Sequence, residues 1–595
     1  MPWEMLSMSI PGTDSADIVW RICHALRATV RRSETLAPPR PRRLVRSRGA
    51  CPWAIVAGAL VLVSVWTTLP APASAQEVGP APTEQPSPTP PLQVPTEPPA
   101  ASPVSSSLDV EELTATIERA RQEWQVPGLA VAVVHRGQPI LVQGFGTRQV
   151  GRTEEVDAQT LFAIASNSKA FTAALLAMLV ADGKLDWDDR VRQHLPWFEM
   201  HDQYAAADMR VRDLLCHRSG LGTFSGDLVW WGTDYPPREV LRRTAQLKPA
   251  HPFRAKYGYS NLMFLAAGEV VVAASGRAWS EMLRDRILQP LGMDRTIASV
   301  RDLPSRGNYA TPHKTLLDRS VPLPWMNWDN MAAAGGIISS AQDMSRWVDM
   351  LLRGGTTADG QTVLAAEQLQ TLWQAHTPID VSDRDRDARP PVHFRAYGLG
   401  WALSDYCGRK IIRHGGGYDG MYSQVTLVPE EELGIVVLTN SMTSISPAIT
   451  DWIIDRALGR SPRGWEESLR RFRESRERFE KRIAQTIAPA AANTHPSREL
   501  DAYAGRYRCS MYGDATVSVE DGHLVLRLLP NPLLVADLEH QHFDTFTLRW
   551  RNELAWFGAG AIQFIPDVRG DFHRLYLDVP NDDMWFYELD LRRAE

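Results

Sequence analysis

The sequence predicts an α+β domain followed by a small all-β domain, and three observations lead to this prediction. Two short apolar runs typical of strands stand near residue 130, helical periodicity fills the middle of the chain, and further strand-like runs end near residue 440. A chain with strands at both ends and helices between them is expected to form one antiparallel sheet covered by helices. From about residue 500, short alternating strands with turn signals such as Asp521-Gly522 predict the second domain.

Length and composition limit the classes of protein that need to be considered. The 595 residues exceed the ~100 to 200 residues of a typical domain, so more than one folded unit is expected. With 44% hydrophobic and 23% charged residues, the chain has an ordinary globular composition. A net charge of −6, spread over both signs, argues against nucleic acid or an anionic membrane as partner. Five cysteines without a CxxC pair predict neither a disulfide framework nor a zinc site.

Residues 1–75 have the three parts of a secretory signal peptide. An arginine-rich stretch precedes the apolar run at residues 53–69, and Ala73-Ser74-Ala75 predicts cleavage before Gln76. The run is shorter than the ~20 residues that a transmembrane helix needs, so a membrane span is the weaker interpretation. Residues 76–107 are rich in proline and predict an extended tether. We therefore expect a periplasmic or secreted protein without a stable membrane span.

The elements of the first domain follow from periodicity and turn residues. A helix is expected from Leu108 until shortly before Pro127, and the runs GLAVAVVHRG and PILVQGFGT predict an antiparallel hairpin. The segment LFAIASNSKAFTAALLAMLVADGKL predicts a short strand and then a long buried helix that Gly183 ends. YGLGWAL, IIRHGGG and QVTLVPEEELGIVVLTN predict three further strands, and a helix near residues 449–458 closes the domain.

These patterns divide the chain after the tether into three parts. The α+β domain is expected at residues 108–460. Residues 461–496 carry many charges of both signs and predict a solvated helical linker. The all-β domain is expected at residues 497–595.

Ser166 and Lys169 are the first candidates for catalysis. They stand three residues apart at the start of the predicted buried helix, so their side chains share one face. A serine hydroxyl is a weak nucleophile unless a neighbouring base takes its proton. A lysine serves as that base only if burial lowers its pKa from about 10.4, and apolar neighbours such as Phe162 and Phe171 are expected to bury it. By itself, the SxxK pattern also fits a solvent-facing pair.

Two further motifs supply the remaining candidates. Tyr259 and Asn261 precede a helical run, and a tyrosine beside a serine–lysine pair can relay protons while an asparagine holds a substrate amide. At the end of the strand IIR, His414 is followed by three glycines. Glycine there lets a substrate pair along the strand edge, and the N–H groups of Gly417 and Ser166 are candidates for an oxyanion hole. Taken singly, the first motif fits a structural tyrosine and the second a simple loop.

Together and in this order, these motifs resemble the SxxK, YxN and (K/H)xG signature of class C serine β-lactamases, low-molecular-weight DD-peptidases and their esterase and D-aminopeptidase relatives. GLAVAVV, LLCHRSGL and AAGGIISSAQDMSRW are similar to that family as well, and the resemblance covers about residues 108–460. It implies the antiparallel sheet flanked by helices of this family and no metal or organic cofactor. It further implies a Ser166 acyl-enzyme, Lys169 and Tyr259 as the acid/base pair, and Asn261, His414 and Gly416 as substrate contacts.

The sequence departs from the family signature at one position and has one additional segment that is similar to a known domain. His414 stands where many β-lactamases have a lysine, and a histidine is a weaker, titratable cation for holding a substrate carboxylate. This favours the DD-peptidase, esterase and D-aminopeptidase members over strong β-lactamases. The segment YAGRY at residues 503–507 resembles the opening of the lipocalin-like β-barrel that is often appended to these hydrolases.

The sequence therefore predicts an exported serine hydrolase that acts on amide or ester bonds. D-amino-acid peptides, β-lactams and small esters are the candidate substrates. The alternative is a sensor or binding protein of the same fold that is acylated by penicillin without turnover, and the three intact motifs argue against it. The chain contains neither a GxSxG nucleophile elbow nor an HExxH zinc helix.

Overall fold

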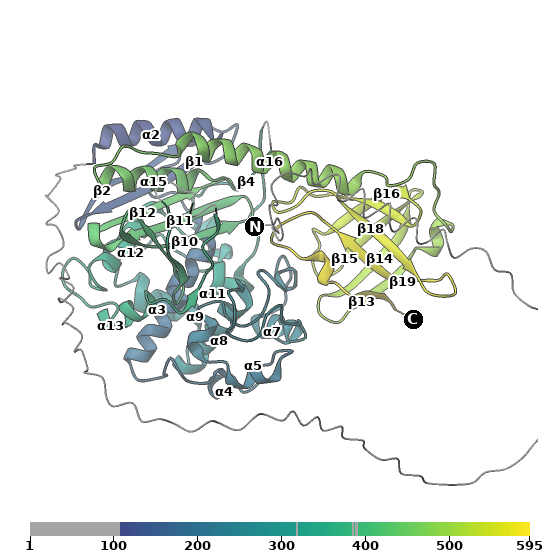
Figure 1. Ribbon diagram of the computed structural model, residues 1–595, viewed down its shortest axis with the longest axis horizontal. Helices are drawn as coiled ribbons and strands as arrows, with labels where there is room; N and C mark the ends of the chain where they lie inside the picture. The colour runs from purple at the N-terminus through teal and green to yellow at the C-terminus, as the bar shows by residue number, and fades with distance from the viewer. Residues whose placement is uncertain (1–107, 317–318, 384–385, 387–390, 595) are drawn as a thin grey trace, which may run out of the picture. The chain divides into compact units, whose positions relative to one another are not determined.

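A computed structural model describes residues 108–316, 319–383, 386 and 391–594 (Figure 1). All of them belong to one compact unit. The predicted signal peptide at residues 1–75 and the tether at residues 76–107 lie outside the described residues.

The central element of the α+β domain is an eight-stranded antiparallel sheet with the strand order β2-β1-β12-β11-β10-β9-β8-β7. Strand β1 (Gly128–His135) pairs with β12 (Leu433–Thr439) along its length, from Leu129 opposite Thr439 to His135 opposite Leu433. The first and last parts of the domain therefore lie side by side in one sheet, which confirms the predicted arrangement.

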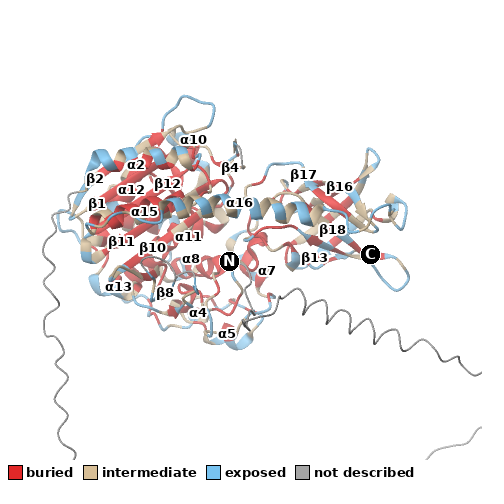
Figure 2. Cartoon of the chain, turned by 45° about the horizontal axis from the view of Figure 1, so that its top comes forward, coloured by how far each residue is buried: buried red, intermediate tan, exposed pale blue. Residues whose placement is uncertain are grey.

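Both faces of this sheet are buried, and β1 shows how. Its residues alternate between two apolar cores, so that Leu129 and Val131 face one core while Ala130 and Ala132 face the other. Helices α2 (Val110–Glu123) and α15 (Ile445–Ala457) cover the first face, while α3, α8 and α12 contribute to the second core (Figures 1 and 2).

The second core surrounds two helices that are apolar on almost every side. Helix α3 (Ser168–Ala181) packs against α8 (Asn261–Ser275), and both are buried along most of their length. Gly183, at a φ of 68°, follows the end of α3, and the N–H of Lys184 returns to Leu179 O at 2.9 Å. The predicted glycine stop is thus confirmed.

The other helices among the described residues of the domain are shorter than α3 and α8. They are α4 (Val191–His194), α5 (Gln203–Asp208), α6 (Val211–Leu214), α7 (Pro237–Thr244), α9 (Trp279–Leu283), α10 (Leu303–Arg306), α11 (Ala332–Gly335), α12 (Ala341–Leu352) and α13 (Ala366–Leu372). The other strands are β2 (Gln138–Gly146), β3 (Phe162–Ala163), β4 (His313–Thr315), β5 (Ser320–Pro322), β6 (Ile338–Ser339), β7 (Thr377–Pro378), β8 (Arg395–Tyr397), β9 (Ala402–Tyr406), β10 (Arg409–Tyr418) and β11 (Met421–Val428).

Two of the expected strands differ from the structure. YGLGWAL is not one strand, because it leaves β8 at Tyr397, turns through Gly400 at a φ of 82°, and enters β9. QVTLVPEEELGIVVLTN forms most of β11 and all of β12 rather than a single strand. A helical turn at Pro429–Glu431 and a φ of 48° at Glu432 reverse the chain between them.

The C-terminal domain is a closed barrel of eight antiparallel strands, which confirms the predicted β-barrel. Helix α16 (Trp465–Ile487) precedes it and has no fully buried residue, as its charged sequence predicts. The strands are β13 (Gly505–Cys509), β14 (Gly513–Glu520), β15 (His523–Leu528), β16 (Val535–His542), β17 (Thr545–Trp550), β18 (Gly560–Pro566), β19 (Phe572–Asp578) and β20 (Leu591–Arg593).

The barrel is hydrogen-bonded to the α+β domain through the segment that follows β19. Glu588 accepts hydrogen bonds from Ser225 Oγ at 2.6 Å and from the N–H of Gly226 at 2.8 Å. The indole N–H of Trp585 donates to Thr223 O at 2.7 Å. The loop at residues 223–226 is therefore held by the barrel.

Among the described residues, no single helix is long and apolar enough to cross a bilayer. Helix α8 and the segment Trp279–Leu288 pass the same test of length and composition only as a pair, and they are bent by 79°.

We expect Phe171→Ala to destabilise the α+β domain strongly. Phe171 is fully buried on α3 and stacks on Trp347 with ring centroids 4.1 Å apart. Removing a buried phenylalanine leaves a cavity and typically costs about 3 to 5 kcal/mol. Urea unfolding followed by tryptophan fluorescence measures the change. As a control, Val272→Ala at a side chain that is 36% exposed should change stability by less than about 0.5 kcal/mol.

Candidate active site

Ser166 lies on a tight turn between β3 and α3. The preceding residue, Ala165, has a φ of 46°, which is uncommon for a residue with a side chain. Ser423 of β11 fixes the turn, because its hydroxyl donates to Ile164 O at 2.6 Å and accepts from Asn167 Nδ2 at 2.8 Å. The turn thus presents Ser166 at the start of a buried helix, as the sequence predicts.

Lys169 is fully buried beside the candidate nucleophile. Its Nζ lies 2.9 Å from Ser166 Oγ, 2.7 Å from Asn261 Oδ1 and 2.8 Å from Ala334 O. Burial lowers the pKa of Lys169 to about 7, and Asp227 opposes that shift. The SxxK pair is therefore not solvent-facing, and a large fraction of Lys169 is neutral near pH 7.

Tyr259 lies over the same lysine, with its ring centroid 4.9 Å from Lys169 Nζ. Burial raises the pKa of Tyr259 well above its usual value, and the Ser166 hydroxyl lowers it in part. His217 supports the tyrosine from behind, because the two ring centroids are 4.1 Å apart and His217 Nδ1 accepts the N–H of Ser260 at 3.1 Å. Tyr259 is thus a neutral phenol held against the nucleophile.

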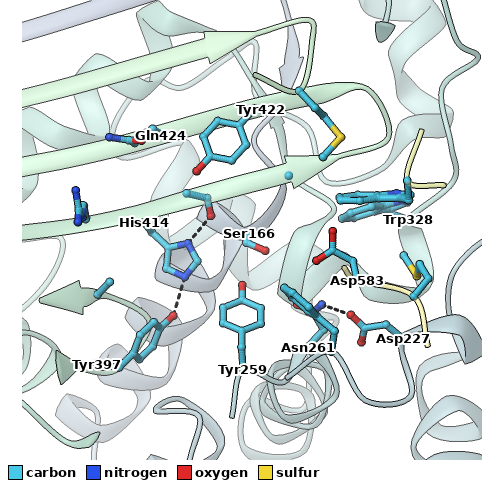
Figure 3. A pocket seen from close by; sticks show the side chains of 18 of the residues that line it. Ser166, Asp227, Tyr259, Asn261, Trp328, Tyr397, His414, Tyr422, Gln424 and Asp583 are labelled. Carbon is cyan, nitrogen blue, oxygen red and sulfur yellow. Dashed lines mark hydrogen bonds between the residues drawn. The ribbon is translucent and has the colours of Figure 1, made fainter. Parts of the chain in front are cut away.

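Asn261 is oriented by charged groups on both sides of its amide. Its Oδ1 accepts from Lys169, while its Nδ2 donates to Asp227 Oδ2 at 2.6 Å (Figure 3). Asp227 is only 2% exposed, and burial raises its pKa to about 7. A chain of polar contacts therefore runs from Ser166 through Lys169 and Asn261 to Asp227.

The edge of strand β10 approaches Ser166 closely. Strand β9 pairs with β10 only as far as Arg413, so the following glycines pair with β11 alone. A Cβ atom on Gly416 would lie 2.2 Å from Ile164 O and 3.0 Å from Ser166 N. Glycine is therefore required for this contact, which brings the strand to the backbone of the nucleophile. The two N–H groups of the predicted oxyanion hole, from Ser166 and Gly417, stay a prediction.

His414 differs from its expected role as a titratable cation. Its Nδ1 lies 2.7 Å from Gly415 O, and its Nε2 lies 2.7 Å from the hydroxyl of Tyr397. A carbonyl only accepts, so Nδ1 carries the proton and Nε2 accepts from the tyrosine. Burial and the nearby Lys169 lower the pKa of His414 to about 3. The contacts and the lowered pKa therefore favour a neutral imidazole at physiological pH, and the role of His414 as a substrate contact stays a prediction.

These groups line one cavity of about 590 Å³. Ser166, Tyr259, Asn261 and the edge of β10 form its reactive side, so the structure brings all three sequence motifs together (Figure 3). Among the described residues, no cluster of three or more His, Cys, Asp or Glu side chains is placed to hold a metal ion.

Sequence reasoning missed several residues that line this cavity or hold its walls. Asp419 accepts the indole N–H groups of Trp328 at 2.8 Å, of Trp556 at 2.9 Å and of Trp231 at 3.1 Å. Trp556 comes from the barrel, and so does Asp583, which also lines the cavity. No local pattern marks these residues, whereas His217 lies within LLCHRSGL, a run that the sequence analysis had singled out.

Comparison with known proteins agrees with this geometry. A family model described as Beta-lactamase matches residues 113–460, more than half of the chain, and a model described as Domain of unknown function (DUF3471) matches residues 489–593. An unguisins hydrolase of Aspergillus campestris is 29% identical over 432 residues, which cover 68% of this chain and 77% of that protein.

Two bacterial or archaeal proteins are similar as well. Penicillin-binding protein 4 of Amycolatopsis lactamdurans is 29% identical over 333 residues, which cover 55% of this chain and 84% of that protein. The structure of the octameric penicillin-binding protein homologue from Pyrococcus abyssi aligns with a TM-score of 0.50 at 21% identity and covers 82% of this chain and 100% of that one. The latter is a likeness of fold.

We expect Gly416→Ala to disable Ser166 while leaving the fold intact. The new methyl group would clash with Ile164 O and Ser166 N and would move the strand edge away from the nucleophile. The rate at which a fluorophosphonate labels Ser166 should fall at least about 100-fold, the scale of losing one preorganised donor. Gly408→Ala is the control, because a Cβ there meets nothing within 4 Å, although its φ of 76° adds local strain. An equal effect of the two substitutions would contradict this reasoning.

The labelling rate of Ser166 should depend on pH through Lys169. The base must be neutral to take the serine proton, and the pKa of Lys169 lies at about 7. The neutral fraction grows as pH rises, so the rate should rise through about pH 7 and level off near pH 9. Fluorophosphonate labelling between about pH 5 and pH 10 tests this. A rate that begins to rise only near pH 10 would exclude Lys169 as the base.

Proposed function

This chain belongs to the Beta-lactamase family, and from this premise we propose that it is a serine hydrolase of amide or ester bonds that works through a Ser166 acyl-enzyme. The observation that carries the proposal is the position of Lys169. Its side chain is fully buried and its Nζ lies 2.9 Å from Ser166 Oγ, so that a lysine with a pKa of about 7 can accept the serine proton at neutral pH.

The proposed reaction begins when Ser166 Oγ attacks the substrate carbonyl carbon and its proton passes to Lys169. The carbonyl oxygen becomes an oxyanion beside the N–H of Ser166 and the edge of β10. The tetrahedral intermediate then collapses, and the bond from the carbonyl carbon to the leaving nitrogen or oxygen breaks. Tyr259, whose raised pKa keeps it protonated at neutral pH, gives its proton to the leaving amine or alcohol and recovers the proton that Lys169 took from Ser166. Water then attacks the ester carbonyl and loses a proton to Lys169, the bond between the acyl carbon and Ser166 Oγ breaks, and Ser166 takes that proton back as the acid product leaves.

The substrate proposed here is a peptide amide, with small esters and β-lactams as further acyl donors. The cavity of about 590 Å³ is of the size that holds a small ligand or a few residues of a peptide. Relatives named unguisins hydrolase and penicillin-binding protein support an acyl-transfer reaction. The signal-like segment at residues 1–75 supports the further proposal that the protein acts in the periplasm or outside the cell.

Intact-protein mass spectrometry tests this proposal. The wild-type protein, exposed to a fluorophosphonate probe and to a penicillin, should gain one adduct from the probe, whereas Ser166→Ala should gain none. Ser280→Ala, at an exposed serine of α9, is the matched control and should be labelled like the wild type.

The lifetime of the penicillin adduct separates two outcomes. An adduct that decays with release of product supports a hydrolase, whereas a stable adduct without product supports the sensor or binding protein of the same fold. Absence of any adduct on the wild type from both compounds would overturn the acyl-enzyme mechanism.

A further inference from the structure

We infer that His217 is a positioning residue, which holds the Tyr259 hydroxyl where it can give its proton to the leaving group. The inference rests on the proposed function, in which Tyr259 is that proton donor. His217 is fully buried and is not one of the residues that line the cavity of Ser166. It therefore acts through the tyrosine and does not touch the substrate.

The backbone on either side of Tyr259 is bound to His217. The carbonyl oxygen of His217 accepts the N–H of Gly258 at 2.9 Å, and its Nδ1 accepts the N–H of Ser260 at 3.1 Å. Gly258 and Ser260 are both buried, so either N–H would be left without a partner if it lost this acceptor, which is costly. One residue thus holds both neighbours of the tyrosine.

The loop that follows His217 holds Tyr259 itself. The N–H of Tyr259 donates to Thr223 Oγ1 at 3.2 Å, and its carbonyl oxygen accepts the N–H of Phe224 at 2.9 Å. The ring of Phe224 meets the ring of Tyr259 at an angle of 62°, with centroids 5.2 Å apart. The backbone contacts therefore fix the point from which the tyrosine side chain extends, and the ring contacts fix its direction.

The imidazole of His217 contacts two tyrosines that belong to different parts of the site. Its ring centroid lies 4.1 Å from that of Tyr259 and 4.4 Å from that of Tyr397. The hydroxyl of Tyr397 in turn lies 2.7 Å from Nε2 of His414 on strand β10 (Figure 3). Tyr259 is only half-buried and lines the cavity, so the position of its ring depends on the groups packed against it. His217 is the group that joins it to the strand edge.

His217 serves this purpose as a neutral imidazole. Its Nδ1 accepts a backbone N–H, so the proton is on Nε2. Burial, together with the nearby Lys169 and His414, lowers the pKa of His217 well below its usual value. A protonated imidazole in ring contact with Tyr259 would stabilise the phenolate. The neutral ring therefore helps the tyrosine to keep the proton that it donates.

Two features of His217 destabilise the fold rather than support it. Its φ of 58° lies in the left-handed region, which is unfavourable for a residue with a side chain. Its buried Nε2 has no hydrogen-bond partner among the described residues, and an unpaired buried donor is costly. Local strain of this kind is concentrated at functional sites, and here it occurs at the residue that holds Tyr259.

The dependence of the reaction on the leaving group tests the role of His217. Benzyl acetate and p-nitrophenyl acetate transfer the same acyl group to Ser166, but benzyl alkoxide must be protonated as it leaves, whereas p-nitrophenoxide leaves as an anion. For the full-length protein, we expect His217→Ala to lower kcat/KM for benzyl acetate at least about tenfold, as misplacing a general acid does, and to change that for p-nitrophenyl acetate less than about threefold.

Two further variants separate positioning from a general loss of structure. His217→Asn keeps an acceptor for Ser260 and suits a positive φ, so it should show a smaller but still selective loss, of about threefold for benzyl acetate. This variant carries the test if His217→Ala does not fold. His313→Ala is the control, because His313 is equally buried and accepts the N–H of Val150 at 3.0 Å, and it should change both rates by the same factor. An equal fall for the two esters in the His217 variants would overturn the inference.

Hydrogen exchange followed by mass spectrometry separates this inference from the proposed function, because it does not need catalysis. The amides of residues 258–260 should exchange at least about fivefold faster in His217→Ala than in the wild type, the factor expected for one lost hydrogen bond, and less so in His217→Asn. This result supports the positioning of Tyr259 by His217 even if the wild type cleaves neither ester, and in that case the proposed function alone would fail. Unchanged exchange in His217→Ala contradicts the positioning role, whatever the kinetics show.

Discussion

Lys169 places an amino group with no solvent exposure between three protein oxygens. The neighbouring groups of the site offset the unfavourable free energy of burying it. An isolated ammonium in such surroundings is strongly unfavourable. The cost is met by Ser166, Asn261 and Ala334, which each lie within 2.9 Å of Nζ, and by a shift of the pKa to about 7. The same desolvation that destabilises the fold also lowers the pKa of the lysine, which makes it a base at neutral pH.

Three separate parts of the chain must therefore meet at one point. The first turn of helix α3 and the turn before it bring Lys169 and Ser166, helix α8 begins at Asn261, and α11 supplies the carbonyl of Ala334. Strand β10 then approaches so closely that only glycine fits at residue 416. The sheet positions this strand by pairing it with β11, whose Ser423 also fixes the turn before the nucleophile. Sheet and helices thus hold the reactive groups through shared residues.

The barrel contributes residues to the wall of the cavity, among them Trp556. Asp419 binds the indole of Trp556 as well as two indoles of the α+β domain, and Glu588 holds the loop that carries Asp227. Because these contacts are at least partly buried and accept on carboxylates, they are stronger than ordinary surface contacts. The shape and charge of the cavity therefore depend on both domains.

The sequence by itself determined the α+β class, the all-β nature of the C-terminal domain, and the Ser166–Lys169 pair. It could do so because helix geometry places residues three apart on one face and because alternation and periodicity report strands and helices. It also marked the glycines after His414 as a strand edge along which a substrate can pair. It misplaced the boundaries at YGLGWAL and QVTLVPEEELGIVVLTN, where turns at Gly400 and at residues 429–432 divide each run between two strands.

Only the tertiary structure decided the electrostatics of the site. The neutral state of His414 depends on Tyr397 and on burial, and the orientation of the Asn261 amide depends on Asp227. Asp583 enters the cavity from the far end of the chain. These contacts join residues that are remote in sequence and leave no local pattern, and the charge state of each group follows from how fully its partners exclude water.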